Sequence, residues 1–131
     1  MNLSAQNAIK IMMGLLLMVI FFHVLIMIQV IPYEIAWGGR LQNTEQMYMF
    51  EALSILLNLF LLFILLMKGR YIKFWLREKT LNIVLVIFLI LFILNTVGNL
   101  FAQTNFEKLF ALLTLIFAFL LWMVLRSKAI N

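Results

Sequence analysis

The chain of 131 residues contains no cysteine and no aspartate, and it has a single histidine and a single proline. The absence of cysteine excludes disulfides, thiol catalysis and cysteine-ligated clusters. The absence of aspartate excludes a Ser-His-Asp triad, and one histidine cannot provide both axial ligands of a bis-histidine haem within one subunit. We therefore expect neither a metal nor another cofactor.

Charge is also scarce. Charged residues make up 11% of the chain and hydrophobic residues 66%, whereas soluble domains are usually about one quarter charged and about half apolar. A globule of this size has too much surface for its volume to hide so much apolar area from water. The composition therefore predicts one domain that folds in lipid.

Four apolar stretches are long enough to cross a bilayer, which takes roughly 20 residues each. The first is ended by Pro32 and is too long for the apolar core of a signal peptide, so we expect it to remain in the mature protein. The sequence thus predicts an all-α fold, an integral membrane four-helix bundle. The expected spans are residues 9–31, 47–67, 81–102 and 106–125.

The positive charges predict the orientation of the spans. Only Arg40 and Lys108 fall in the first and third loops. Because Lys and Arg are enriched on the cytoplasmic side, both termini and the second loop are expected to be cytoplasmic. The second loop, residues 68–79, alternates cations with aromatic residues, which favours contact with anionic lipid over nucleic acid. The eight remaining cations are Lys10, Lys68, Arg70, Lys73, Arg77, Lys79, Arg126 and Lys128.

Several polar residues of the predicted spans are expected at a similar depth in the bilayer. At the helical rise per residue, His23, Glu51, Asn95 and Asn99 lie about 20 to 27 Å from the inner ends of their spans, in the outer half of the bilayer. Asn95, Asn99 and Gln103 share one helical face, with Gly98 beside it, and Glu51, Ser54 and Asn58 share another. Because polar groups are costly against lipid, both faces are expected to point into the bundle.

These positions predict a polar pocket near the outer surface. Glu51, Asn95 and Asn99 would surround it, and His23 would reach it from the first span. The first loop would form a lid in which Trp37 and Arg40 close over the pocket and Gly38-Gly39 make a tight turn. We therefore predict six ligand-binding residues: Glu51, Asn95, Asn99, His23, Arg40 and Trp37.

Each of these residues also has a structural interpretation. Arg40 is the strong cation available to Glu34, Glu45 or Glu51, so Glu51 could simply form an ion pair with it. Asn95 and Asn99 could be hydrogen bonds between helices, and His23 a satisfied core histidine. Met47 and Met49 could suggest copper, but they point about 200° apart on a helix, so we expect no metal there.

Two helix starts are predicted from capping patterns. Asn43 or Thr44 would cap the second span, with Gln46 completing the cap from Asn43, and Thr104 with Glu107 forms a capping-box pattern. The segments that begin at Phe50 and Phe106 also resemble each other. A duplication of a helical hairpin would explain this likeness and would predict a pseudo-two-fold axis along the membrane normal.

The segments WGGRLQNTEQM from Trp37, Phe50-Glu51, NTVGN from Asn95 and FEK from Phe106 resemble a family of small bacterial four-span membrane proteins. The resemblance covers nearly the whole chain. It implies the fold class and a multi-pass protein of the bacterial plasma (inner) membrane, and it carries no activity, ligand or catalytic residue with it.

The favoured functional hypothesis is binding of an amphipathic or lipidic small molecule in the pocket. An accessory or assembly subunit of a membrane complex, with purely structural polar residues, is the alternative, and a small dimeric transporter is a further one. The expected partners are membrane lipid and either a second copy or a larger membrane complex, and not nucleic acid. Whether a reaction occurs stays open, although His23 with Glu51 is the acid/base pair that an enzyme would use.

Overall fold

The computed structural model describes residues 3–37 and 40–127. Within these ranges the chain is helical and contains no strand. This confirms the predicted all-α class. The helices are α1 (Ala5–Met27), α2 (Tyr33–Trp37), α3 (Thr44–Lys68), α4 (Glu78–Leu100) and α5 (Asn105–Arg126).

The four long helices are each long and apolar enough to cross a membrane. Large apolar side chains cover their outer faces: Met18 is 68% exposed, Leu56 64% and Leu94 61%. Exposed apolar area on this scale is unfavourable in water and ordinary in lipid. The fold is therefore compatible with a four-helix membrane bundle.

Helix α1 ends earlier than predicted, at Met27 instead of Ile31. Gln29 adopts a left-handed φ of 63°, and Val30 N–H donates to the Leu25 carbonyl while Gln29 N–H donates to the Ile26 carbonyl, both at 2.9 Å. This is a Schellman motif, which satisfies the last carbonyls without further helical turns. The prediction was wrong because Pro32 marks only the latest point at which a helix could continue.

The helix starts agree with the capping patterns except in one detail. Asn43 caps α3 by accepting from Gln46 N–H, but the Gln46 side chain accepts from Gln42 N–H at 2.9 Å and not from Asn43. Thr104 and Glu107 form the predicted reciprocal capping box at the start of α5. The start of α3 at Thr44 places Glu51 two turns inside that helix.

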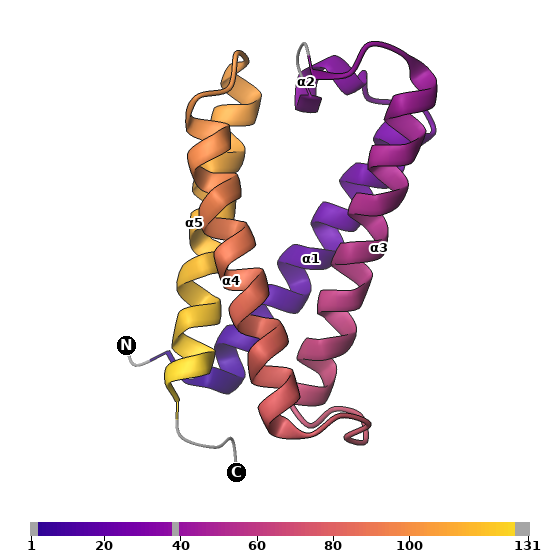
Figure 1. Ribbon diagram of the computed structural model, residues 1–131. Coiled ribbons are helices and arrows are strands. Elements are labelled where there is room, and N and C mark those ends of the chain that lie inside the picture. Colours follow the sequence, from indigo (N-terminus) through magenta and orange to yellow (C-terminus); the bar gives the residue numbers. More distant parts are fainter. Residues whose placement is uncertain (1–2, 38–39, 128–131) are drawn as a thin grey trace.

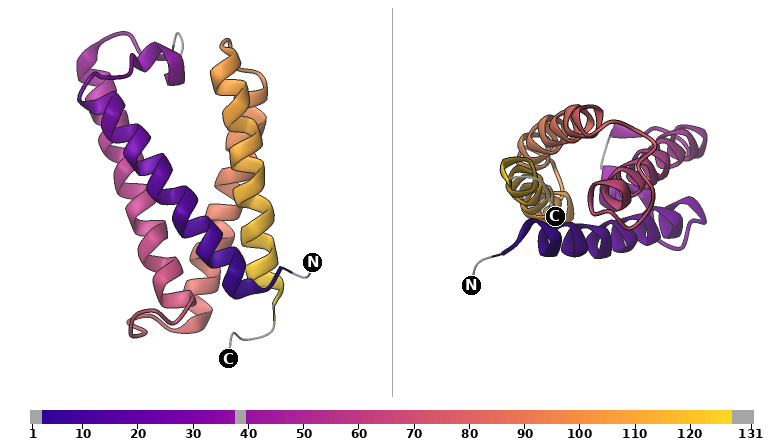
Figure 2. Two further views of the ribbon diagram at one scale, coloured as in Figure 1. Left: turned by 180° about the vertical axis from the view of Figure 1, so that it is seen from behind. Right: turned by 90° about the horizontal axis from the view of Figure 1, so that it is seen from below.

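The helices pair as two hairpins, because α1 packs chiefly on α3 and α4 chiefly on α5. Figures 1 and 2 show the start of α1, the end of α5 and the α3–α4 connection at one end of the bundle, and α2 with the α4–α5 connection at the other. We call the latter the α2 end. Because α1 starts and α5 ends at the same end of the bundle, the arrangement agrees with an even number of spans. The side of the membrane on which this end lies remains a prediction.

The two hairpins pack closely together at the end where α1 starts and α5 ends. All four long helices contribute to one apolar core there, and a smaller core of Ile26, Leu41 and Met47 lies beneath α2. Between these cores the hairpins diverge toward the α2 end (Figures 1 and 2). The large core comprises Ala8, Ile9, Met12, Leu16, Leu61, Ile64, Leu65, Met67, Leu81, Leu85, Phe88, Phe117, Leu120, Leu121 and Val124.

Candidate functional site

A cavity of about 230 Å³ lies between the two hairpins and reaches α2. Residues from all five helices line it, together with Arg40. Of the six predicted site residues, five line this cavity, and Glu51 lies behind two of them. The polar and indole side chains of the lining are His23, Trp37, Arg40, Ser54, Asn58, Asn95, Asn99 and Thr114.

Glu51 connects the lid to the bundle. Its side chain is fully buried, and its two carboxylate oxygens have different partners. Oε1 accepts from the indole Nε1 of Trp37 at 2.5 Å, and Oε2 lies 2.6 Å from Nδ1 of His23. A buried carboxylate is costly unless it is paired and hydrogen-bonded, and these two contacts compensate that cost.

The contact with Glu51 also orients His23. A carboxylate at Nδ1 favours the tautomer that carries a proton on that nitrogen, which leaves Nε2 able to accept a hydrogen bond. His23 lines the cavity and its side chain is 15% exposed. Within the part of the chain that the structure describes, His23 makes no second side-chain hydrogen bond. Glu51 therefore contributes to the cavity through the residues that it positions.

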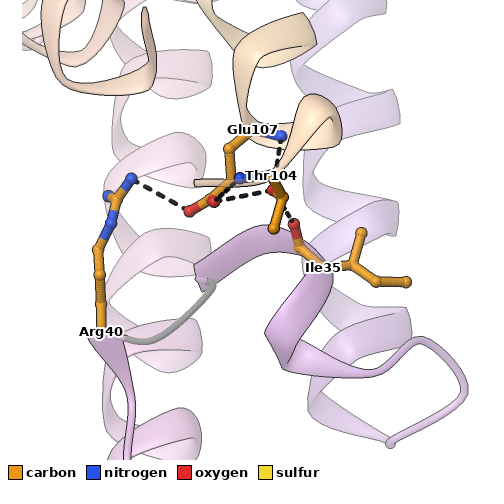
Figure 3. A network of polar contacts seen from close by, with 4 residues as sticks. All are labelled: Ile35, Arg40, Thr104 and Glu107. Carbon is orange, nitrogen blue, oxygen red and sulfur yellow. Dashed lines mark hydrogen bonds and ion pairs between the residues drawn. The ribbon is translucent and has the colours of Figure 1, made fainter. Parts of the chain in front are cut away.

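Arg40 has a partner that the sequence analysis did not consider. Its guanidinium lies 3.1 Å from Oε1 of Glu107, at the start of α5 (Figure 3), and Glu34, Glu45 and Glu51 are not its ion-pair partners. The expectation was wrong because Glu107 is distant in sequence and was assigned to the capping box alone. Glu107 performs both roles, since its other oxygen, Oε2, is bound by Thr104.

A second contact fastens the lid to α5. The Thr104 hydroxyl lies 3.1 Å from the Ile35 carbonyl of α2 and 2.8 Å from Oε2 of Glu107 (Figure 3). One hydroxyl proton serves one of these acceptors at a time. The first loop is thus joined to α3 through Trp37 and to α5 through Ile35 and Arg40. Gly38 and Gly39, predicted to form a turn, lie outside the described residues.

Two asparagine side chains of α4 face the cavity and form no hydrogen bond to another described helix. Asn95 and Asn99 line it, and neither side chain forms a hydrogen bond to any residue among 3–37 and 40–127. The structural interpretation, in which Asn95 and Asn99 form hydrogen bonds between helices, therefore does not describe this structure. Gln103, expected on the same face, does not belong to the cavity lining.

The hydrogen bond that joins α4 to α5 was missed. The hydroxyls of Thr96 and Thr114 lie 2.8 Å apart, and each also reaches a carbonyl of its own helix. Threonine frequently makes such contacts between membrane helices, so two threonines in apolar spans were an available signal. On α3, Asn58 donates to the Ser54 carbonyl of its own helix.

A polar cluster that sequence reasoning also missed lies at the other end of the bundle. Lys68, only 6% exposed, donates to Glu78 at 3.1 Å and to Asn82 at 2.8 Å. It joins the end of α3 to the start of α4 across the basic loop. Opposite charges ten residues apart on either side of a short connection were the available signal.

Comparison with family models, with curated proteins and with solved structures finds no match for this chain.

Proposed function

We propose that the protein binds the polar end of an amphipathic or lipidic small molecule in the cavity between its two hairpins. The observation that carries the proposal is the pair of amides, Asn95 and Asn99, which face the cavity with no hydrogen bond to any described residue. Asn95 is exposed and Asn99 half-buried, and in a membrane an amide that meets only hydrocarbon costs several kcal/mol. A bound polar group would remove this cost.

The rest of the wall suits such a ligand. Small-molecule sites combine a mostly apolar lining with a few polar groups that converge on one place. Here the lining includes Phe88, Phe92 and Phe117. The amides offer both donors and acceptors, and Nε2 of His23 adds an acceptor. On the predicted orientation, the cavity lies in the outer half of a bacterial plasma membrane.

The test is native mass spectrometry of the protein released from its own membrane. Wild type is compared with Asn95→Leu, which removes an amide that forms no side-chain hydrogen bond to a described residue. Gln103→Leu is the matched control, because this amide is exposed and lies outside the cavity. Circular dichroism melting of all three proteins confirms that they are folded.

We expect a discrete additional mass on wild type and on Gln103→Leu, and its loss or strong reduction on Asn95→Leu. The fragmentation of the released molecule would identify its chemical class. A bare chain in all three samples would contradict the proposal. A polypeptide bound equally to all three would favour the accessory-subunit alternative, and proton-dependent uptake in vesicles would favour the dimeric transporter.

A further inference from the structure

The lid covers the cavity at the α2 end, with the Arg40 side chain, 48% exposed, at its edge. Trp37 is bound to Glu51 of α3, and Arg40 to Glu107 of α5. The backbone of α2 accepts from Thr104 at its Ile35 carbonyl. A segment fastened to both hairpins obstructs the direct path from the aqueous phase at the α2 end.

The cavity is also closed between α1 and α5 and at its floor. The Phe22 ring of α1 packs against Phe106 and Phe110 of α5, with ring centroids 5.5 and 5.3 Å apart. Deeper in the bundle, Phe92 and Phe117 are stacked at 4.9 Å. Aromatic contacts of this kind fill the space between helices with close-packed rings.

The side of the cavity between α3 and α4 is more exposed than the side between α1 and α5. Leu57 of α3 and Leu91 of α4 both line the cavity, yet they are 41% and 40% exposed. The lining residues of α1 and α5 are less exposed than these two, and Thr114 and Phe117 are buried. Figures 1 and 2 show α3 and α4 moving apart toward the α2 end. On the long helices, a side chain that both lines the cavity and faces outward marks an opening between neighbouring helices.

From these walls we infer that the cavity opens sideways into the membrane between α3 and α4, and that its ligand is a chain-bearing lipid that enters from the bilayer. This inference rests on the proposed function and names the class of ligand. The cavity volume of about 230 Å³ is below the roughly 300 Å³ at which pockets for whole drug-sized ligands begin. The cavity therefore holds part of the molecule, and the remainder stays between the helices and in lipid.

The positions of the lining residues give the ligand a direction. Leu91 lies one helical turn, about 6 Å, from Asn95 and toward the middle of the membrane. A polar head at Asn95 and Asn99 would thus leave its chain at the opening beside Leu57 and Leu91. Arg40, the cation of the lining, already forms an ion pair with Glu107, and His23 already contacts the Glu51 carboxylate. The head that fits is uncharged and rich in hydroxyl or amide groups.

The experiment uses a monoacylglycerol with a diazirine on its acyl chain, in phosphatidylcholine vesicles that contain the full-length protein. After irradiation, modified residues are identified by mass spectrometry. Phe117, at 2% exposure, and its stacking partner Phe92 report chains inside the bundle, since ordinary surrounding lipid does not reach Phe117. A diazirine fatty acid tests the preference for an uncharged head.

The opening is tested with Leu91→Trp, which narrows it, and with Leu57→Trp from the opposite helix. Leu94→Trp is the matched control, because Leu94 belongs to the same helix and is 61% exposed but does not line the cavity. We expect adducts on Phe92 and Phe117 in wild type and in Leu94→Trp. They should fall several-fold in both opening variants, and the fatty acid should label these residues less than the monoacylglycerol does.

The outcomes separate this inference from the proposed function. Adducts that persist at Phe117 in both opening variants would overturn the sideways route and leave ligand binding intact. No adducts at Phe117 in wild type, while native mass spectrometry still finds an additional mass that depends on Asn95, would overturn the lipid class alone. A bare protein together with no adducts would overturn both.

Discussion

Arg40, in the segment that follows α2, forms a 3.1 Å ion pair with Glu107 at the start of α5. The same segment is bound to α3 through Trp37 and Glu51. Two buried carboxylates, one from each hairpin, thus hold the first loop across the divergent end of the bundle. The Phe-Glu pairs at 50–51 and 106–107, which suggested a duplication in the sequence, supply both carboxylates. The duplication itself remains a prediction.

Removal of the ion pair should loosen the lid. We expect Arg40→Gln to lower the free energy of unfolding by about 1 to 3 kcal/mol, because Glu107 stays buried and loses its charged partner. Urea unfolding in mild detergent measures this change, and Lys108→Gln, an exposed neighbour, is the control. The double variant with Glu107→Gln should cost less than the sum of the single variants. Strict additivity would show that the two side chains do not interact.

The Trp37–Glu51 hydrogen bond can be followed by fluorescence. The chain has three tryptophans, so Trp75→Phe with Trp122→Phe leaves Trp37 as the single reporter. In this background Glu51→Gln should shift the emission to longer wavelength and increase quenching by acrylamide, because an amide cannot accept from both Trp37 and His23 as the carboxylate does. Glu34→Gln, an exposed position in α2, should change neither. An unchanged spectrum in Glu51→Gln would contradict the anchoring of the lid.

The threonine pair and the adjacent amide should behave differently. Thr96→Val is expected to destabilise the bundle by about 0.5 to 1.5 kcal/mol, the range found for one hydrogen bond between membrane helices. Asn95→Leu should change stability by no more than about 0.5 kcal/mol in ligand-free protein. Thermal unfolding in detergent compares the two, and a cycle with Thr114→Val isolates the pair. If Asn95→Leu were the more damaging change, its amide would have a structural role.

The predicted orientation can be tested with single cysteines, since the chain has none of its own. Glu45→Cys, at an exposed position in the first turn of α3, should react with an impermeant maleimide in intact cells. Lys73→Cys, exposed in the basic loop, should react only after the membrane is permeabilised. The reverse pattern would place the α2 end in the cytoplasm.

Several local features could be predicted because they depend on near neighbours. The cap of α3 by Asn43 and the box of Thr104 with Glu107 follow from residues three positions apart. The shared helical face of Asn95 and Asn99 follows from the helical period. The early end of α1 could not be predicted in this way, because it depends on the left-handed backbone of Gln29, a residue type for which that conformation is uncommon.

By itself, the sequence determined the four apolar helices, and it predicts a membrane environment and a common depth for the polar residues. These features depend on hydropathy and helical rise, which are properties of the chain taken along its length. Only the tertiary structure decided that Arg40 meets Glu107, that Glu51 holds both His23 and Trp37, and that Thr96 meets Thr114. These pairings depend on how two hairpins diverge and on the path of one loop between them. A buried carboxylate must be paired with a donor, and the geometry of the fold decides which donor lies close enough to pair with it.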